Sequence, residues 1–270
     1  MKGFSILEMT VAMTIMLAAT AGVFAVLLPS HGSMAAQTEA SDMQQRLRVA
    51  TDALSRDLVG AGALMPSVAA IRPYRAGAVR PDAPDAFKSD TITIATMSRA
   101  GTMQSATYWQ QGDDDAGTYQ LLLYDGTASG ADVPVVDHLV SLQFEYWGDP
   151  RPPVRTGPLS EDTCLFAAGD PPTPKLALLA EGPALIRLGA AQLTDGPWCP
   201  DAAAVDRWDA DLLRIRRVAV TVRVEAAAAS LRGPASALFV HGGSSRGGGG
   251  WLPDIEARFD VAPRNLNLAR

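Results

Sequence analysis

The sequence has few of the residues on which most catalytic and nucleic-acid-binding sites depend. It contains only three histidines in 270 residues, and His31, His138 and His241 are scattered along the chain. The one basic cluster lies within residues 214–217, in a chain with a formal net charge of −6 and a pI of about 5.1. Nucleic-acid-binding domains typically carry a basic patch and have a high pI. We therefore expect neither an enzyme nor a nucleic-acid-binding protein.

Two motifs that suggest chemistry lack the context that their chemistry needs. Residues 243–247 have the glycine spacing of a nucleophile elbow, but that motif opens a helix, and here further glycines follow. Carboxylates that could ligate calcium stand in two groups, Asp113–Asp115 and the set Asp195, Asp201, Asp206, Asp209 and Asp211. Neither group has EF-hand spacing. We interpret the first group as a solvated turn, and Asp209 with Asp211 as residues that cap or orient the start of a strand, so no metal or cofactor is predicted.

Charge is almost absent from the start of the chain. Lys2 precedes an apolar run from Phe4 to Leu28, and Glu8 is the only charged residue within that run. About 20 apolar residues suffice to cross a bilayer. A charge inside such a span costs on the order of 2.5–3.5 kcal/mol on insertion scales, so charged residues there usually have a partner and a function. If the chain is cleaved after Gly3, the new amine of Phe4 is the candidate partner of Glu8.

This arrangement resembles the class III signal of type IV pilins and pseudopilins. The resemblance rests on Gly3, on the phenylalanine after it, and on an acid as the fifth residue of the mature chain. It implies cleavage by prepilin peptidase between Gly3 and Phe4, methylation of the Phe4 amine, and a role for Glu8 in subunit registration. A secretory signal typically has an apolar region of about 7–15 residues. A plain signal anchor explains the length of the run but not the spacing of these residues.

The helix is expected to continue beyond the span, over residues 29–62. Pro29 should kink or interrupt it, because proline lacks an N–H group and clashes with the preceding turn. Apolar residues at helical spacing then form one stripe: Met43, Leu47, Ala50, Leu54, Leu58 and Ala61. Such a stripe predicts an amphipathic helix with one buried face. Gly60 and Gly62 should end the helix before Pro66.

Residues 63–270 are enough for one sizeable domain. Alternation of apolar and polar residues in this part predicts half-buried strands. The predicted strand segments are 91–94, 119–124, 142–146, 218–224 and 255–261. Turn-rich sequence lies between them, and no internal repeat is evident. The expected fold class is α+β: a leader at 1–3, a transmembrane helix at 4–28, its amphipathic continuation at 29–62, and an antiparallel sheet packed on that continuation in a head at 63–270.

The resemblance extends into the head. Residues 42–62, 135–146 and 212–225 are similar to PilW-like minor pilins, and the J-type pseudopilin of type II secretion shares the same plan. The resemblance implies a minor pilin or pseudopilin that primes or joins assembly of a type IV pilus or related filament. A minor pseudopilin of a type II secretion system is the close alternative. An adhesive or ligand-binding module displayed on a pilin stem is the alternative of another class.

The same interpretation predicts where the protein is located and which partners it has. Because Lys2 is the only charge before the span, the positive-inside rule places the head outside the cytoplasm. We expect a single-pass inner-membrane protein that later joins a pilus or periplasmic filament. Its expected partners are prepilin peptidase, other pilins or pseudopilins, the inner-membrane assembly platform and membrane lipid. In an oxidising compartment Cys164 and Cys199 are expected to form a disulfide, and two unpaired thiols are the alternative.

Overall fold

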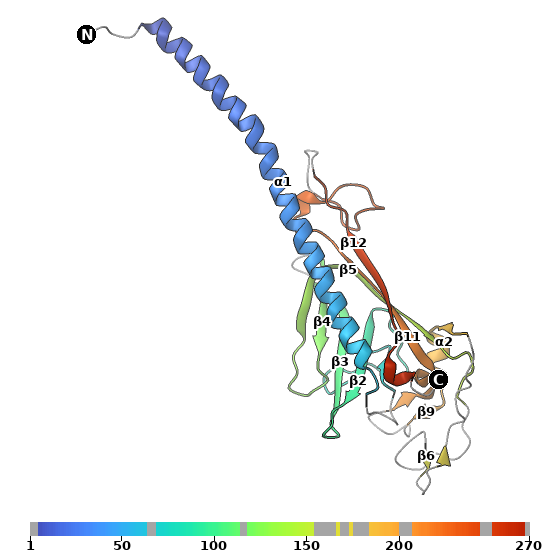
Figure 1. Ribbon diagram of the computed structural model, residues 1–270. Helices are drawn as coiled ribbons and strands as arrows, with labels where there is room; N and C mark the ends of the chain where they lie inside the picture. The colour runs from blue at the N-terminus through green and yellow to red at the C-terminus, as the bar shows by residue number, and fades with distance from the viewer. Residues whose placement is uncertain are drawn as a thin grey trace. The chain divides into compact units, whose positions relative to one another are not determined.

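The computed structural model describes residues 5–63, 69–113, 118–153, 166–167, 173–174, 184–199, 207–243 and 250–267. These residues form two compact units (Figure 1). The first unit contains residues 1–44 and 225–254, and the second contains residues 45–224 and 255–270. The sheet lies in the second unit, and the apolar start of the chain lies in the first.

One long helix, α1 (Ile6–Gly60, 55 residues), makes up the N-terminal part of the chain. The helix is unbroken through Pro29 and Gly32, so the expected interruption at Pro29 is wrong. Proline removes a single backbone donor, and the turns on either side keep their own hydrogen bonds. Prolines are also tolerated in helices with the composition of a membrane span.

The end of α1 agrees with the prediction from its glycines. The helix stops at Gly60, and Gly62 follows with a φ of +76°, a backbone conformation that favours glycine. The Gly62 amide donates to the Ala95 carbonyl at 3.0 Å, and the Asn265 side chain donates to the Ala61 carbonyl at 3.2 Å. The helix end is therefore tied to both a strand and the C-terminal segment.

Eight of the described strands form one antiparallel sheet with the order β1-β2-β3-β4-β5-β11-β12, and β8 pairs with β5. The strands are β1 (Ile71–Arg72), β2 (Thr91–Met97), β3 (Met103–Asp113), β4 (Thr118–Tyr124), β5 (Val133–Gly148), β8 (Ile186–Leu188), β11 (Ile215–Val224) and β12 (Ile255–Val261). The five predicted strand segments lie in β2, β4, β5, β11 and β12. An α+β fold with a large antiparallel sheet is therefore present.

Short elements fill the connections. Two small pairs are β6 (Phe166–Ala167) with β7 (Thr173–Pro174), and β9 (Trp198–Cys199) with β10 (Trp208–Asp209). The helical turns are α2 (Ala190–Leu193), η1 (Ala210–Arg214), η2 (Ala229–Leu231) and η3 (Arg264–Leu266).

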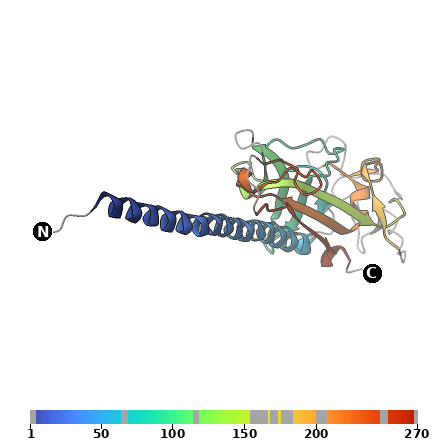
Figure 2. The ribbon, with the colours of Figure 1, turned by 90° about the horizontal axis from the view of Figure 1, so that it is seen from above.

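The core of the second unit lies between the sheet and the C-terminal part of α1. Val218, Val220 and Val222 of β11 are fully buried, and Val220 stands opposite both Phe144 and Phe259. Ala50, Leu54 and Leu58 of α1, and Ala61 just after its end, are also fully buried. Figure 2 shows this end of the helix along one face of the sheet. Burial of these apolar side chains stabilises the unit by roughly 25 cal/mol per Å² of apolar area.

Candidate functional site

The N-terminal part of α1 has no packing partner among the residues that the structure describes. Residues Ile6–Ala25 form a 20-residue apolar segment with a mean hydropathy of 1.8, and none of it is buried. Its length and composition suit a membrane span, and a signal sequence near an N-terminus has the same properties. Such a segment favours an apolar environment, and the other described residues do not cover it.

The hydroxyl groups of this segment are satisfied within the helix. Thr10 donates to the Leu7 carbonyl at 2.9 Å, and Thr20 donates to the Met16 carbonyl at 2.7 Å. Thr14 donates in the same way to the Thr10 carbonyl. Hydrogen bonds of this kind let a helix carry threonine without leaving a polar group unpaired in an apolar medium.

Glu8 is the exception among these polar groups. It lies in the first turn of α1, where the helix dipole favours an acid, and the Ser5 amide donates to its carboxylate at 3.5 Å. That contact is long, and Glu8 is exposed. Gly3 and Phe4, the other two residues of the predicted processing site, lie outside the described residues. The pairing of Glu8 with the Phe4 amine therefore stays a prediction.

The C-terminal part of α1 is held on the sheet by polar contacts as well as by its apolar stripe. The Tyr108 hydroxyl of β3 donates to the Asp57 carboxylate at 2.6 Å. Burial and the Asp57 carboxylate raise the pKa of Tyr108, so the phenol stays protonated and remains a donor. Arg46 forms an ion pair with Asp137 of β5 at 2.8 Å. These contacts fix the rotation of the helix on the sheet.

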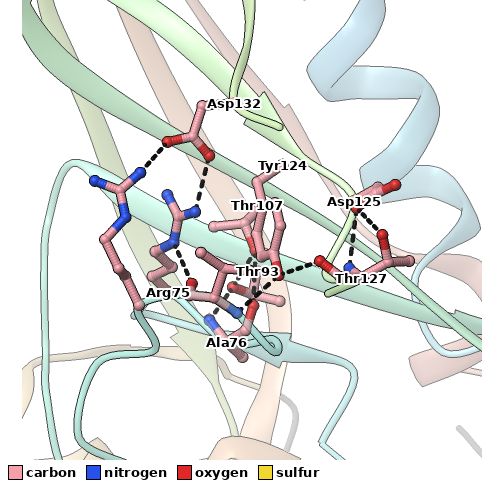
Figure 3. Close-up of polar contacts among 10 residues, drawn as sticks. Arg75, Ala76, Thr93, Thr107, Tyr124, Asp125, Thr127 and Asp132 are labelled. Carbon is pink, nitrogen blue, oxygen red and sulfur yellow. Dashed lines mark hydrogen bonds and ion pairs between the residues drawn. The ribbon is translucent and has the colours of Figure 1, made fainter. Parts of the chain in front are cut away.

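A second polar cluster surrounds Arg75 in the loop between β1 and β2. Its guanidinium lies 4.2 Å from the Trp109 ring centroid and 4.4 Å from that of Tyr124. Figure 3 shows Arg75 facing Asp132, to which it donates at 2.8 Å. Asp132 also accepts from Arg80 at 2.9 Å. The arginine is thus stacked and ion-paired within the chain, which makes this cluster a clamp for the loop rather than an open binding site.

The acidic residues near residue 209 form a third cluster. One carboxylate oxygen from each of Asp195, Asp209 and Asp211 lies within 4.8 Å of the others, and the last two residues are buried. Asp209 accepts from the amides of Gly196 and Asp211, the latter as the N-cap of η1. The predicted capping role is therefore confirmed for Asp209. Asp201 and Asp206 lie outside the described residues.

Asp211 has a different role in this cluster. It forms an ion pair with Arg214 at 2.8 Å through one oxygen, while its other oxygen is buried without a hydrogen-bond partner. Burial is the largest cause that raises the pKa of Asp211 to about 7, and the charge of Asp209 adds to it. Asp113 ends β3, and Asp114 and Asp115 lie outside the described residues.

The histidines and cysteines that the structure describes lie in different parts of the chain and do not form a common site. His138 lies in β5, and the His241 ring lies 2.9 Å from the Glu225 carboxylate, which is fully buried and also pairs with Arg232. Cys199 is fully buried in β9 and is not a free thiol. Cys164, its predicted partner, lies outside the described residues, so their pairing stays a prediction. Ser244 to Gly247 of the elbow-like motif also lie outside them.

One pocket of about 370 Å³ opens beside β5 and β8. Its wall includes Glu145, whose two oxygens pair with Arg187 at 2.7 Å and with Arg258 at 2.9 Å. The carboxylate is therefore held between two arginines of the chain. Sequence analysis identified none of these three residues, because their partners are 42 and 113 positions away (187 − 145 and 258 − 145).

The polar clusters described in the second unit are thus largely paired within the chain, whereas the apolar segment Ile6–Ala25 and Glu8 are not packed. The segment and its carboxylate are the part of the described chain with the strongest requirement for an external partner. No protein-family model matches the chain, and no curated protein or solved structure is significantly similar to it.

Proposed function

We propose that this chain is a minor pilin-like subunit that primes or joins assembly of a type IV pilus or related filament. The observation that carries the proposal is one continuous helix with two different surroundings. Residues Ile6–Ala25 are apolar and unpacked, whereas Ala50, Leu54 and Leu58 are buried in the second unit. Such a helix can enter a membrane or a filament core with one part while the other part holds a head.

Glu8 supplies the register in this proposal. An ionised carboxylate in an apolar medium needs a partner. The amine that prepilin peptidase creates at Phe4 is a cation at the same depth, either in the same chain or in a neighbouring subunit. A pair between subunits fixes the axial stagger of two helices, because only one register brings the opposite charges together.

Before assembly, the proposal places the subunit in the inner membrane with its head outside the cytoplasm. There it meets prepilin peptidase, other pilins or pseudopilins, and the assembly platform. The type II secretion alternative requires the same helix and the same processing. Identification of the subunits that co-purify with this chain separates a pilus from a secretion filament.

Processing between Gly3 and Phe4 gives the first test. Gly3→Leu should block cleavage, because a protease subsite that accepts only glycine has no room for a side chain. Intact-mass spectrometry of the membrane fraction should find wild-type chains that start with methylated Phe4, and Gly3→Leu chains that retain residues 1–3. Lys2→Arg, which keeps the charge before the span, is the matched control and should be processed normally. Wild-type chains that retain Met1, or Gly3→Leu chains that start at Phe4, would refute the proposal.

A further inference from the structure

The connection between β11 and β12 has an unusual composition. No aspartate or glutamate occurs between Glu225 and Asp254, in a chain whose formal net charge is −6. The structure describes residues 226–243 and 250–254 of this connection. Anionic groups are therefore absent from a long stretch of an otherwise acidic protein, which removes one source of repulsion from an anionic surface.

The connection packs on α1 just beyond the apolar segment. The Ala227 amide donates to the Glu39 carboxylate at 2.6 Å. A Cβ atom on Gly250 would lie 3.7 Å from the Ala36 Cβ, so Gly250 passes directly beside the helix. Both contacts lie within the first compact unit, and Figure 1 shows the described part of this connection next to α1.

A small folded cluster holds the connection in shape. Arg232 donates to the Ala226 carbonyl at 2.7 Å and pairs with the buried Glu225. Phe239 is buried, and a Cβ atom on Gly233 would lie 2.7 Å from the Phe239 ring and 2.9 Å from that of Trp251. One side of the indole is thus packed against the backbone of Gly233.

Three large apolar side chains of the same cluster remain exposed. Leu238 is 50% exposed, Val240 is 49% exposed and Trp251 is 43% exposed. The Asp254 amide donates to the Leu238 carbonyl at 3.0 Å, and the Val240 amide donates to the Asp254 carboxylate at 2.9 Å. Leu238 and Val240 therefore lie beside the segment that carries Trp251. A folded cluster that exposes a leucine, a valine and a tryptophan indicates an interaction surface.

The contact with α1 lies a short way beyond the apolar segment, so a tilted helix can bring the patch to the bilayer surface. Ala36 follows Leu28, the last residue of the apolar run, by eight positions, which is about 12 Å along a helix. The headgroup layer on one side of a bilayer takes up roughly 5–8 Å. Membrane helices tilt by about 20° on average, and a tilt toward this side shortens the remaining distance. Tryptophan is enriched at the headgroup level of a bilayer because its ring is apolar and its N–H is polar.

We propose that Leu238, Val240 and Trp251 form a membrane-contact patch that enters the headgroup layer of the bilayer crossed by α1. The proposal rests on the proposed membrane anchoring of the chain. Lipid is the chosen occupant because the patch and the apolar segment Ile6–Ala25 belong to one compact unit, and because residues 226–253, which carry the patch, include no acidic residue. The patch acts before assembly, while the subunit is still in the membrane. There the patch limits the orientations that the helix can adopt.

The test uses the full chain reconstituted into vesicles of phosphatidylethanolamine and phosphatidylglycerol, with either plain or brominated acyl chains. Bromine quenches tryptophan emission at short range. The chain has five tryptophans, so brominated lipid should lower wild-type emission by up to the share of one of them. Trp251→Phe should abolish that loss, and Trp147→Phe, a variant in β5, should retain it. Leu238→Ser combined with Val240→Ser should reduce the loss with Trp251 still present.

Two results separate a failure of this patch from a failure of anchoring. Equal quenching in wild type and Trp251→Phe, in vesicles from which carbonate does not extract the protein, overturns the patch and leaves anchoring intact. Extraction by carbonate overturns the anchoring, and the patch with it. A photo-crosslinker at position 251 that captures a second copy of the chain instead of lipid also overturns the proposal, because the patch is then a subunit contact.

Discussion

Asp211 shows how one buried carboxyl group makes the stability of the second unit depend on pH. Its ordinary pKa is 3.8, and in the folded chain burial raises the pKa to about 7 even though Arg214 lies 2.8 Å away. Between these values the folded state holds a proton that the unfolded state has released. The free energy of unfolding therefore falls as the pH rises from about 4 to about 7, and this contribution is fully present only below the lower value.

Asp211→Asn should flatten this dependence, because asparagine does not titrate. We expect the loss of unfolding free energy between pH 4 and pH 7 to be smaller in the variant than in wild type, whatever the variant's absolute stability. Urea unfolding of the full chain in detergent micelles at several pH values measures it. Asp260→Asn, at a half-exposed position in β12, is the control and should leave the slope unchanged. Equal slopes in wild type and Asp211→Asn would contradict the expectation.

At the scale of elements, the contact between α1 and the sheet carries much of the stability of the second unit. Leu54 is fully buried at this contact, whereas Val59, five residues further along the same helix, is 55% exposed. Leu54→Ala should lower the free energy of unfolding by about 2–5 kcal/mol, because it removes apolar contacts and leaves a cavity. Val59→Ala should change it by less than about 0.5 kcal/mol.

Urea unfolding of both variants in micelles, followed by circular dichroism, distinguishes the two positions. Similar losses of stability for Leu54→Ala and Val59→Ala would mean that the apolar stripe is not the face that holds the helix.

The same elements show which parts of the fold could be predicted. The valines of β11 are buried, and the residues of β12 alternate between partly buried and exposed, so the period of two in both strands is visible in the sequence. The strand β3 was missed, because Gln104, Gln110 and Gln111 interrupt any such pattern. One of these glutamines has a structural role: the Gln110 side chain accepts from the Leu142 amide at 2.9 Å, where β4 no longer pairs with β5.

The functional features also fall into two groups: some can be identified from the sequence alone, and others are brought together only by the fold. The apolar run and Glu8 are local in sequence, so spacing alone identifies them. The clamp around Arg75 draws on Trp109, Tyr124 and Asp132, residues 34 to 57 positions away (109 − 75 and 132 − 75), and only the fold brings them together. The patch around Trp251 was not predicted. The absence of acids between Glu225 and Asp254 is the sequence feature that could have revealed it.

At the scale of the whole molecule, α1 joins two requirements that are usually met by separate elements. Its first part favours an apolar environment that the described residues of the chain do not supply, and its last part completes the core of the second unit. Glu8 is compatible with the first requirement only if a cation reaches it. The function proposed here therefore depends on whether this carboxylate directs assembly.

Glu8→Gln tests that dependence most directly. The variant should still insert and be cleaved, because the apolar run and Gly3 are unchanged, but it should assemble poorly because the register loses its electrostatic cue. The measurement is the amount of this subunit in sheared filaments relative to its membrane pool. Asp52→Asn, which removes an exposed carboxylate further along α1, is the matched control and should keep the wild-type ratio. The account predicts a lower ratio for Glu8→Gln alone, and an unchanged ratio with an unchanged number of filaments would contradict it.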